Sequence, residues 1–475
     1  MKVHWEPMCD DMPARHLAPL VLAMTLLCGA SAARAQPPPL EDLFDLRASD
    51  PALLRQPPRQ LLTTDWLADR DAALSGWLKA GIGANAWGSD FNGPVVMNDR
   101  NGQGMLNQLA LVGHKPLTDE TGWGTRVDLL YGTDWWTAVA RGLDAFPFNE
   151  VNALGVPRWS SSRYYGLALP QFYAEAGRED LSILVGHFYT PLGYEVAPAI
   201  GNFFSSRNNA FEYGTPTTHT GILGTWVAAE GVSLTAGIMN GWDNFSDGMP
   251  VVANPDYPGA NSNLAFVGET LLESEDGQRE MGFAITTGNE YSPRVDDDGR
   301  PLLPTAGNLT MYTLFVVTRV SERLTWVVEH SNAWQFHADT GFANQGQLPA
   351  LAQWYGITHY SYLELHERLA AGMRVEWFRD NNGSRVFYPI RNVVTNSDPV
   401  SGGFAGNFWA ITWGLHWLVG RNWTVRPELR FDWFTPDAYG SGAVPFGDIT
   451  TLPGGLVTGD AYGQLYGGCD VVAQF

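Results

Sequence analysis

The sequence predicts an all-β protein, a transmembrane antiparallel β-barrel of about sixteen strands with short periplasmic turns and long extracellular loops. Three observations support this prediction: a signal peptide, a long series of two-faced strands, and a regular alternation of short and long connections. The abundance of aromatic residues and glycine suits strands with interface girdles and many turns. We therefore divide the 475 residues into a signal peptide (1–35), a periplasmic N-terminal segment (36–75) and an outer-membrane barrel (76–475).

The N-terminus has the features of a secretory signal peptide. Leu17–Ala30 is an apolar run, and Ala33–Ala35 forms an A-x-A cleavage site, so we expect cleavage before Gln36. Acidic residues are unusual ahead of such a run, which leaves Met8 or Met12 as alternative start codons. No later segment approaches the roughly twenty apolar residues of a transmembrane helix, so a membrane location requires a closed barrel.

The mature chain is strongly acidic. Residues 1–35 contain three basic and three acidic residues, so the net charge of −21 belongs to the rest of the chain. This charge argues against nucleic acid as a partner. Only Cys469 follows the signal peptide, and no disulfide framework is expected. The segment 36–75 is proline-rich at its start and later tolerates short helices.

From Trp77 onward the chain divides into strand-like runs. In order, the predicted runs are Leu78–Trp87, Asn107–His114, Trp123–Gly132, Gln171–Ala176, Leu181–Phe188, Thr218–Val227, Val232–Gly241, Leu264–Leu271, Glu280–Gly288, Thr310–Thr318, Leu324–Ser331, Tyr355–Leu365, Leu369–Arg379, Phe408–Leu418, Trp423–Phe434 and Gln464–Phe475. Seven short turns and eight long loops separate these runs. Outer-membrane barrels show this alternation, and barrels of about this size enclose an aqueous channel.

The run Trp423–Phe434 shows the two faces most clearly. Apolar residues such as Leu429 and Phe431 alternate with charged residues such as Arg430. Successive side chains of a strand point to opposite faces, so the apolar face is expected to meet lipid and the charged face to line a wet interior. A soluble sandwich would show the same pattern, but the alternation of connections favours the barrel. Pro427 cannot donate to the ladder and predicts a bulge or irregular pairing.

Eleven charged residues on the inward faces are the candidate pore-lining residues. They are Arg126, Asp128, Glu175, Glu280, Glu329, Arg374, Glu376, Arg426, Glu428, Arg430 and Asp432. Four are basic and seven are acidic, which predicts a mild preference for cations, because charges along a pore set its selectivity. In the alternative explanation, neighbours of opposite sign pair across strands and only make the wall rigid.

Two loops, Thr133–Leu167 and Tyr189–Thr217, are long enough to enter the lumen. The second contains the sequence TPLGYEVAPAIGNFF, which is unusually apolar and aromatic for a loop in solvent. Long loops are often functional, so one explanation is a constriction of the channel. The other is that the loop packs on itself over the rim of the barrel.

Six segments resemble a known family. They are YGTD at Tyr131–Asp134, LPQFYAE at Leu169–Glu175, VGHFYTPLGYE at Val185–Glu195, NFFSS at Asn202–Ser206, THTG at Thr218–Gly221 and GIMNGWDN at Gly237–Asn244. They are similar, in this order, to the OmpL-like family of β-barrel porins, the second β-barrel-porin group. The resemblance runs from about Trp77 to the C-terminus and implies an outer-membrane barrel of a Gram-negative-type envelope with a channel role. It supplies no catalytic residues.

We therefore expect a channel in the cell outer membrane for passive diffusion of small hydrophilic solutes or ions. The expected partners are outer-membrane lipid, these solutes and the barrel-assembly machinery, which recognises a terminal aromatic residue such as Phe475. A homotrimer is expected by analogy with other porins. No catalytic motif, metal-ligand spacing or cofactor motif assigns an enzyme activity. Two alternatives stay open: a non-conducting barrel with structural or adhesive surface loops, and a barrel-embedded hydrolase whose Ser/His pair leaves no local motif.

Overall fold

The computed structural model describes residues 62, 64–95, 97–144, 159, 162, 164–246, 264–295, 301–338, 350–386, 403–437, 442–451 and 457–475. All of these residues belong to the unit of residues 37–475. The predicted signal peptide, its cleavage site and most of the predicted periplasmic segment lie outside the described residues.

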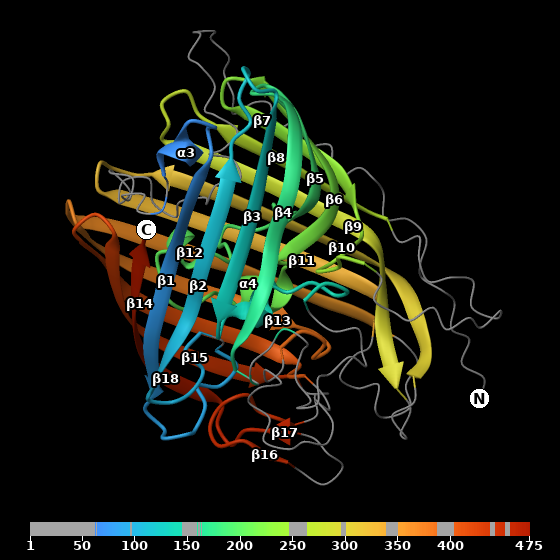
Figure 1. The fold of residues 1–475 in the computed structure, drawn as a ribbon. Coiled ribbons are helices and arrows are strands. Elements are labelled where there is room, and N and C mark those ends of the chain that lie inside the picture. Colours follow the sequence, from blue (N-terminus) through green and yellow to red (C-terminus); the bar gives the residue numbers. More distant parts are fainter. Residues whose placement is uncertain are drawn as a thin grey trace. The chain divides into compact units, whose positions relative to one another are not determined.

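Sixteen strands form one closed antiparallel barrel (Figure 1). They are β1 (Ala73–Asn85), β2 (Gln103–Lys115), β3 (Trp123–Gly132), β4 (Gly166–Arg178), β5 (Leu181–Tyr189), β6 (Thr218–Ala229), β7 (Val232–Met239), β8 (Ala265–Glu273), β9 (Arg279–Val295), β10 (Pro301–Arg319), β11 (Leu324–Ala338), β12 (Ala350–His366), β13 (Leu369–Asp380), β14 (Gly406–Val419), β15 (Trp423–Pro436) and β18 (Gly463–Gln474). β18 closes the ring by pairing with both β1 and β15. The predicted fold class and strand number are confirmed.

The connections alternate between short and long, as predicted, except between β9 and β10, where both strands extend beyond their predicted bounds and leave only residues 296–300. The turn between β4 and β5 has two residues, 179–180, whereas the connection between β5 and β6 runs over residues 190–217. The last long connection contains a small sheet of β16 (Thr450–Thr451) and β17 (Val457–Thr458), which the sequence analysis missed.

Helices in the described chain are short. The segment before the barrel contains α3 (Asp65–Ala68), within the stretch expected to tolerate short helices. The long connections contain the 3-10 helices η2 (Trp135–Ala138) and η3 (Ala199–Gly201) and the helix α4 (Asn209–Gly214). None of the described helices is long and apolar enough to cross a membrane.

Nine of the sixteen barrel strands begin and end within two residues of their predicted bounds. The largest differences are in β9 to β11, which extend well beyond the predicted runs. In β9 the apolar alternation stops at Gly288, because Asn289 and Glu290 follow, yet the backbone pairing with β10 continues. Hydrophobic periodicity therefore detects the part of the strand with one apolar face and misses its polar tip.

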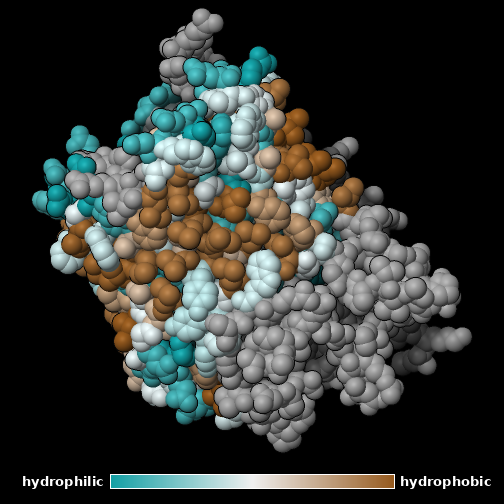
Figure 2. Space-filling view, viewed as in Figure 1, coloured by the Kyte–Doolittle hydropathy of each residue, from teal (hydrophilic) through white to brown (hydrophobic). Residues whose placement is uncertain are grey.

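The two faces of β15 lie as predicted. Leu429 and Phe431 are 46% and 39% exposed, whereas Arg430 and Asp432 between and beside them are 1% and 3% exposed. On the side of the barrel that Figure 2 shows, hydrophobic side chains form a band across the middle of the strands, and hydrophilic side chains gather beyond it. The apolar faces therefore point outward and the charged faces inward.

Pairing around Pro427 is irregular on one side only. Pro427 pairs in register with Cys469 of β18. On the side of β14, the pairing stops at Gly414 opposite Glu428 and resumes three residues later in the same register. The predicted irregularity is therefore present as a gap in the ladder without a register shift.

Much of the hydrophobic core lies inside the barrel, between the wall and the connection that follows β5. Leu192 and Tyr213 of this connection belong to the same buried cluster as Met311, Trp354 and Phe378 of the wall. The connection thus contributes to the core instead of extending into solvent.

Candidate functional site

The connection between β5 and β6, residues 190–217, runs through the interior of the barrel; we call it the inserted loop. Gln108 of β2 donates a hydrogen bond to the carbonyl of Ala197 at 3.1 Å. Arg374 of β13 donates to the carbonyl of Ser206 at 2.9 Å. Strands β1, β18, β15 and β14 separate β2 from β13, so the loop reaches across the interior (Figure 1). Of the two explanations for this loop, the structure supports entry into the lumen and not packing over the rim.

Two glycines of the wall make room for the aromatic part of the inserted loop. A Cβ atom at Gly372 of β13 would clash with the ring of Phe203, and one at Gly414 of β14 would lie 3.0 Å from the ring of Phe204. The Phe203 ring also packs against Tyr362, with 4.7 Å between the ring centroids. Glycine inside a strand often marks such a close approach.

Arg374 is the most connected cation of the site and is 0% exposed. Its Nη1 donates to a carboxylate oxygen of Glu195 at 2.9 Å, and its Nη2 donates to the carbonyl of Arg207 at 3.1 Å. Its Nε lies 3.3 Å from Oε1 of Glu376. Two carboxylates and two backbone carbonyls therefore compensate for the water that the buried guanidinium has lost.

Three carboxylates of the wall accept hydrogen bonds from backbone N–H groups of the inserted loop. The pairs are Glu329 with Tyr194 at 2.8 Å, Glu376 with Asn209 at 2.7 Å, and Glu428 with Ser205 at 3.0 Å and Ser206 at 3.1 Å. A hydrogen bond to a carboxylate is stronger than one to a neutral acceptor, because the negative charge attracts the N–H group. These contacts fix the path of the loop across the interior.

The arginines of β15 also hold the loop, and each is paired with an aspartate. Arg426 binds Asp470 of β18 through two hydrogen bonds of 2.8 and 2.6 Å, and its Nη1 donates to the carbonyl of Ala199 at 2.8 Å. Arg430 donates to Asp432 and to the carbonyl of Arg207, both at 2.7 Å. Both arginines are therefore paired with carboxylates of the wall, and both also bind the backbone of the inserted loop.

Four of the eleven candidates lie away from this cluster. Arg126 and Asp128 form a separate buried pair on β3, with 2.8 Å between Nε and Oδ1. Glu175 and Glu280 are half-buried near the short-turn ends of β4 and β9, and Glu175 accepts a hydrogen bond from the backbone of Leu117. The structure therefore gathers seven candidates around the inserted loop, and their role in lining a pore stays a prediction.

Five further buried charged residues near the inserted loop escaped the sequence analysis: Lys79, Asp134, Glu195, Arg207 and Asp470. The Nζ of Lys79 lies 3.4 Å from Asp134 and 3.7 Å from Asp470. Lys79 and Asp470 lie in strands, where the inward face could have been read from the alternation. The other three lie in loops, where no periodicity marks the direction of a side chain. Two are basic and three acidic, so the acidic majority remains.

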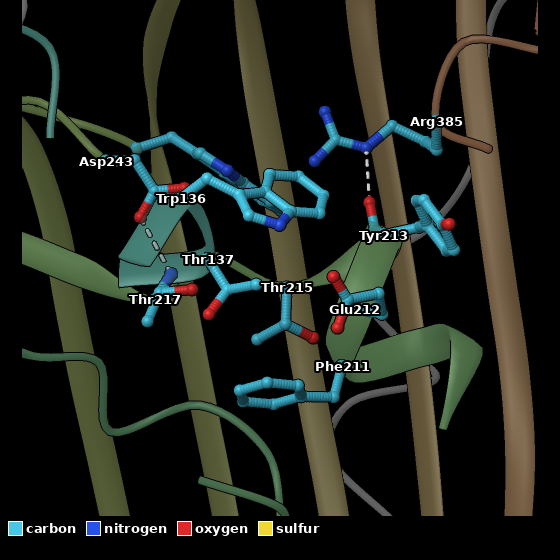
Figure 3. Close-up of a pocket in the computed structure, with 10 residues that line it drawn as sticks. Trp136, Thr137, Phe211, Glu212, Tyr213, Thr215, Thr217, Asp243 and Arg385 are labelled. Atoms are coloured by element: carbon cyan, nitrogen blue, oxygen red, sulfur yellow. Dashed lines mark hydrogen bonds between the residues drawn. The ribbon is translucent and has the colours of Figure 1, made fainter. Parts of the chain in front are cut away.

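Long loops from one rim of the barrel enclose a cavity of about 170 Å³, which we call the mouth cavity (Figure 3). Its lining includes Trp136, Phe211, Glu212, Trp242, Asp243 and Arg385. They come from the loops between β3 and β4, β5 and β6, β7 and β8, and β13 and β14. The Arg385 guanidinium carbon lies 4.6 Å from the ring centroid of Trp242 and 4.5 Å from that of Trp354.

One Ser/His contact bears on the hydrolase alternative. His359 Nε2 and Ser361 Oγ lie 2.9 Å apart on β12. A nucleophilic site also needs a group that orients the base. The register partners of His359 are Val328 and Val375, and within the described residues no acceptor faces its other ring nitrogen. In the same part of the chain, no group of three or more His, Cys, Asp or Glu side chains is placed to hold a metal ion.

Comparison with known proteins gives one family match. The model of the family described as "Putative beta-barrel porin-2, OmpL-like" matches residues 71–475. OprB of Pseudomonas putida at high pH is 12% identical with a TM-score of 0.49, and the match covers 88% of this chain and 99% of that chain. The trimer form of OmpT of Vibrio cholerae is 8% identical with a TM-score of 0.48, covering 85% and 99%. No curated protein sequence matches the chain at a significant level.

Proposed function

We propose that this chain, which belongs to the OmpL-like family of outer-membrane β-barrel porins, is a channel for passive diffusion of small hydrophilic solutes and ions. The inserted loop is the observation that carries the proposal. It narrows the interior of a closed barrel and lies against a charged wall. Passage is then governed by the size of the solute and by the local electrostatic potential, with no turnover and no cofactor.

The charges of the interior support a mild preference for cations. Acidic residues outnumber basic ones among the eleven predicted residues and also among the five charges that the sequence analysis missed. The negative net charge of the whole chain acts in the same direction, because it raises the local concentration of cations. Ion pairs such as that of Arg426 with Asp470 cancel part of the field, so the preference is small.

Planar bilayers test this function directly. Purified protein is expected to give steady conductance steps. Under a salt gradient, the sign of the reversal potential is expected to show that cations pass more readily than anions. The Glu376→Gln variant keeps an oxygen acceptor for Asn209 but loses a charge, so its cation preference should fall. Glu120→Gln, at an exposed short turn, is the matched control. Unchanged selectivity in the Glu376→Gln channel would contradict the assignment of this residue to the pore.

The anchoring of the inserted loop favours a second candidate function, a non-conducting barrel whose surface loops serve structure or adhesion. Arg374, Arg426 and Glu428 are all buried and bind the backbone of the loop, which fills space that a wide pore would need. The bilayer experiment separates the two candidates. Complete absence of conductance steps from folded protein would contradict the channel and leave the non-conducting barrel.

We also propose that the chain is cleaved before Gln36, that the assembly machinery recognises Phe475, and that the barrel forms a homotrimer. At the closed seam, the backbone of Phe475 exchanges hydrogen bonds of 2.7 and 2.8 Å with Gly76, which ties the C-terminus to the first strand. This contact supports a role of the terminal residue in closing the barrel.

A further inference from the structure

The mouth cavity has the size of one small ring. Its volume of about 170 Å³ equals that of roughly six water molecules, and a cavity of about 150 Å³ holds a six-membered aromatic ring. Its lining comes from loops that are far apart in the sequence, as Figure 3 shows for Trp136, Glu212 and Arg385. One six-membered ring with polar substituents therefore fits the space.

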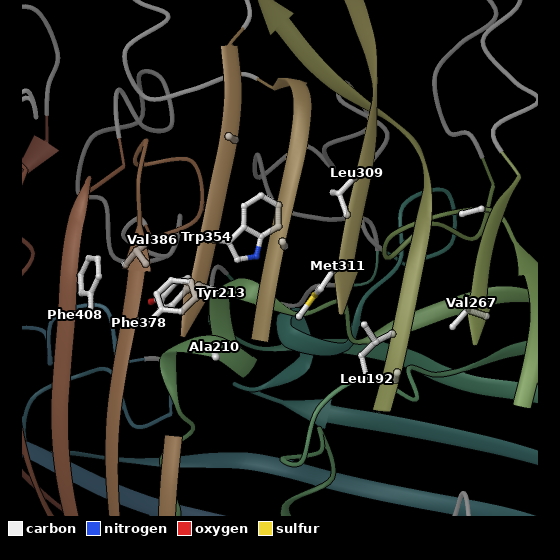
Figure 4. Packing of buried hydrophobic residues seen from close by; sticks show 14 of the residues in the cluster. Leu192, Ala210, Tyr213, Val267, Leu309, Met311, Trp354, Phe378, Val386 and Phe408 are labelled. Carbon is white, nitrogen blue, oxygen red and sulfur yellow. The ribbon is translucent and has the colours of Figure 1, made fainter. Parts of the chain in front are cut away.

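Hydrogen bonds between loops hold this cavity in shape. Asp243 accepts from the backbone N–H of Thr217 at 2.7 Å, and Arg385 donates through Nε to the carbonyl of Tyr213 at 2.8 Å (Figure 3). Tyr213 in turn belongs to the packed cluster that contains Trp354 and Phe378 (Figure 4). The lining is thus fixed before any solute arrives, which lowers the cost of binding.

The lining combines apolar faces with groups that donate and accept hydrogen bonds. Trp136, Phe211 and Trp242 supply aromatic surface, the carboxylates of Glu212 and Asp243 accept, and the guanidinium of Arg385 donates. In the described part of the chain, the guanidinium of Arg385 makes a hydrogen bond through its Nε only, so its two Nη groups have donors to offer.

The charges of the lining disfavour charged solutes. An anion in the cavity would lie beside the two carboxylates of Glu212 and Asp243. A cation gains little from these carboxylates, because Arg141 and Arg385 already act on Asp243 and Arg207 lies close enough to interact with Glu212. A neutral solute with apolar faces and many hydroxyl groups meets neither obstacle, and its hydroxyls can both donate and accept.

We propose that the mouth cavity is a binding site for a neutral polyhydroxylated ring, a single sugar ring, at the entrance of the channel. The proposal rests on the proposed function and names the class of solute. A sugar ring places its C–H face on an aromatic ring, and its hydroxyls reach Glu212, Asp243 and Arg385. Binding at the mouth concentrates the solute ahead of the narrow interior.

Calorimetric titration of the folded barrel in detergent tests the proposal without need of conductance. The probes are glucose, choline and succinate, which represent a neutral polyol, a cation and an anion. We expect saturable binding of glucose with a dissociation constant on the order of millimolar, and none of the two charged probes in the same range. Binding of choline or succinate in preference to glucose would overturn the assignment of the solute class.

Two variants locate the site. Glu212→Gln retains the shape of the side chain and loses its charge, so glucose should bind several-fold more weakly, because hydrogen bonds to a charged acceptor are the stronger ones. Trp136→Leu removes aromatic surface and should weaken binding about tenfold. Trp87→Leu is the control, since Trp87 is 53% exposed and lies outside the cavity lining. Unaltered affinity in both cavity variants would place the sugar elsewhere and sink the proposal.

The result of the glucose titration can be distinguished from the result of the conductance experiment. Conductance steps without any binding of glucose would overturn the sugar site and leave the channel intact. Binding of glucose by a barrel that gives no steps would support the site and contradict the channel.

Discussion

At the level of single residues, Asp243 is a half-buried carboxylate that links two loops outside the barrel strands. Its Oδ1 accepts from the backbone N–H groups of Thr217 at 2.7 Å and Thr218 at 2.8 Å. Burial raises the pKa of Asp243 to about 6, although these hydrogen bonds and the nearby Arg141 and Arg385 lower it in part. The charged form is therefore costly in the folded protein.

We expect the Asp243→Asn variant to gain stability over the wild type as the pH rises from about 4 to about 6. The unfolded chain ionises first, with a pKa near 3.9, and this ionisation favours unfolding until the folded protein also ionises at about 6. The asparagine retains an oxygen acceptor and cannot ionise. The gain is at most about 3 kcal/mol at neutral pH.

Thermal melting followed by circular dichroism at pH 4 and pH 7.5 measures this gain as the difference in Tm between the two proteins. The charged groups around Asp243 are Arg141, Arg385 and Glu290, with Glu212 in the same cavity lining. They are common to both proteins, so their own titration largely cancels in the difference. A difference in Tm that stays constant with pH would contradict the prediction.

At the level of elements, the path of the inserted loop depends on contacts between distant parts of the chain. Glu428 and Ser205 are separated by 223 positions, so no local pattern reports their hydrogen bond. The strands were predictable because each carries its own alternation of apolar and polar residues. For the loop, the apolar and aromatic segment TPLGYEVAPAIGNFF was the local sign, and it fitted packing over the rim equally well.

Removing the carboxylate of Glu428 should loosen this part of the inserted loop. In Glu428→Ala, the backbone N–H groups of Ser205 and Ser206 lose their acceptor. A hydrogen bond to a charged group contributes about 1.5–3 kcal/mol, so these amides should exchange with solvent about 10- to 100-fold faster. Hydrogen exchange with mass spectrometry on peptides over residues 203–208 measures the change.

Glu280→Ala is the matched control for this experiment, because Glu280 is half-buried near a short turn, at the start of β9. We expect its exchange over residues 203–208 to equal that of the wild type. Equal protection in the Glu428→Ala protein would mean that other contacts, such as those of Arg374, hold the loop alone.

At the level of the whole molecule, the barrel could be predicted from the sequence, whereas the sites inside it could be predicted only in part. The strand number and the closure of the barrel depend on a pattern that is repeated along the chain. An error in the bounds of one strand therefore changes the predicted fold very little. The pairing of Arg426 with Asp470 depends on the register between β15 and β18, and the mouth cavity depends on how separate loops fold against one another. These relations need the three-dimensional register, which alternation along one strand does not contain.

Closure of the barrel depends on close contacts at Gly76. The backbone of Gly76 exchanges two hydrogen bonds with Phe475, and a Cβ atom there would overlap the carbonyl oxygen of Ala110 and lie 2.7 Å from the Phe475 ring. Gly76→Ala should therefore lower the free energy of unfolding by about 1–3 kcal/mol, the usual cost of overpacking. Gly104→Ala in β2 is the control, since nothing lies within 4 Å of its added atom. Urea titration followed by tryptophan fluorescence compares the two variants, and equal midpoints would show that the seam tolerates a side chain at this position.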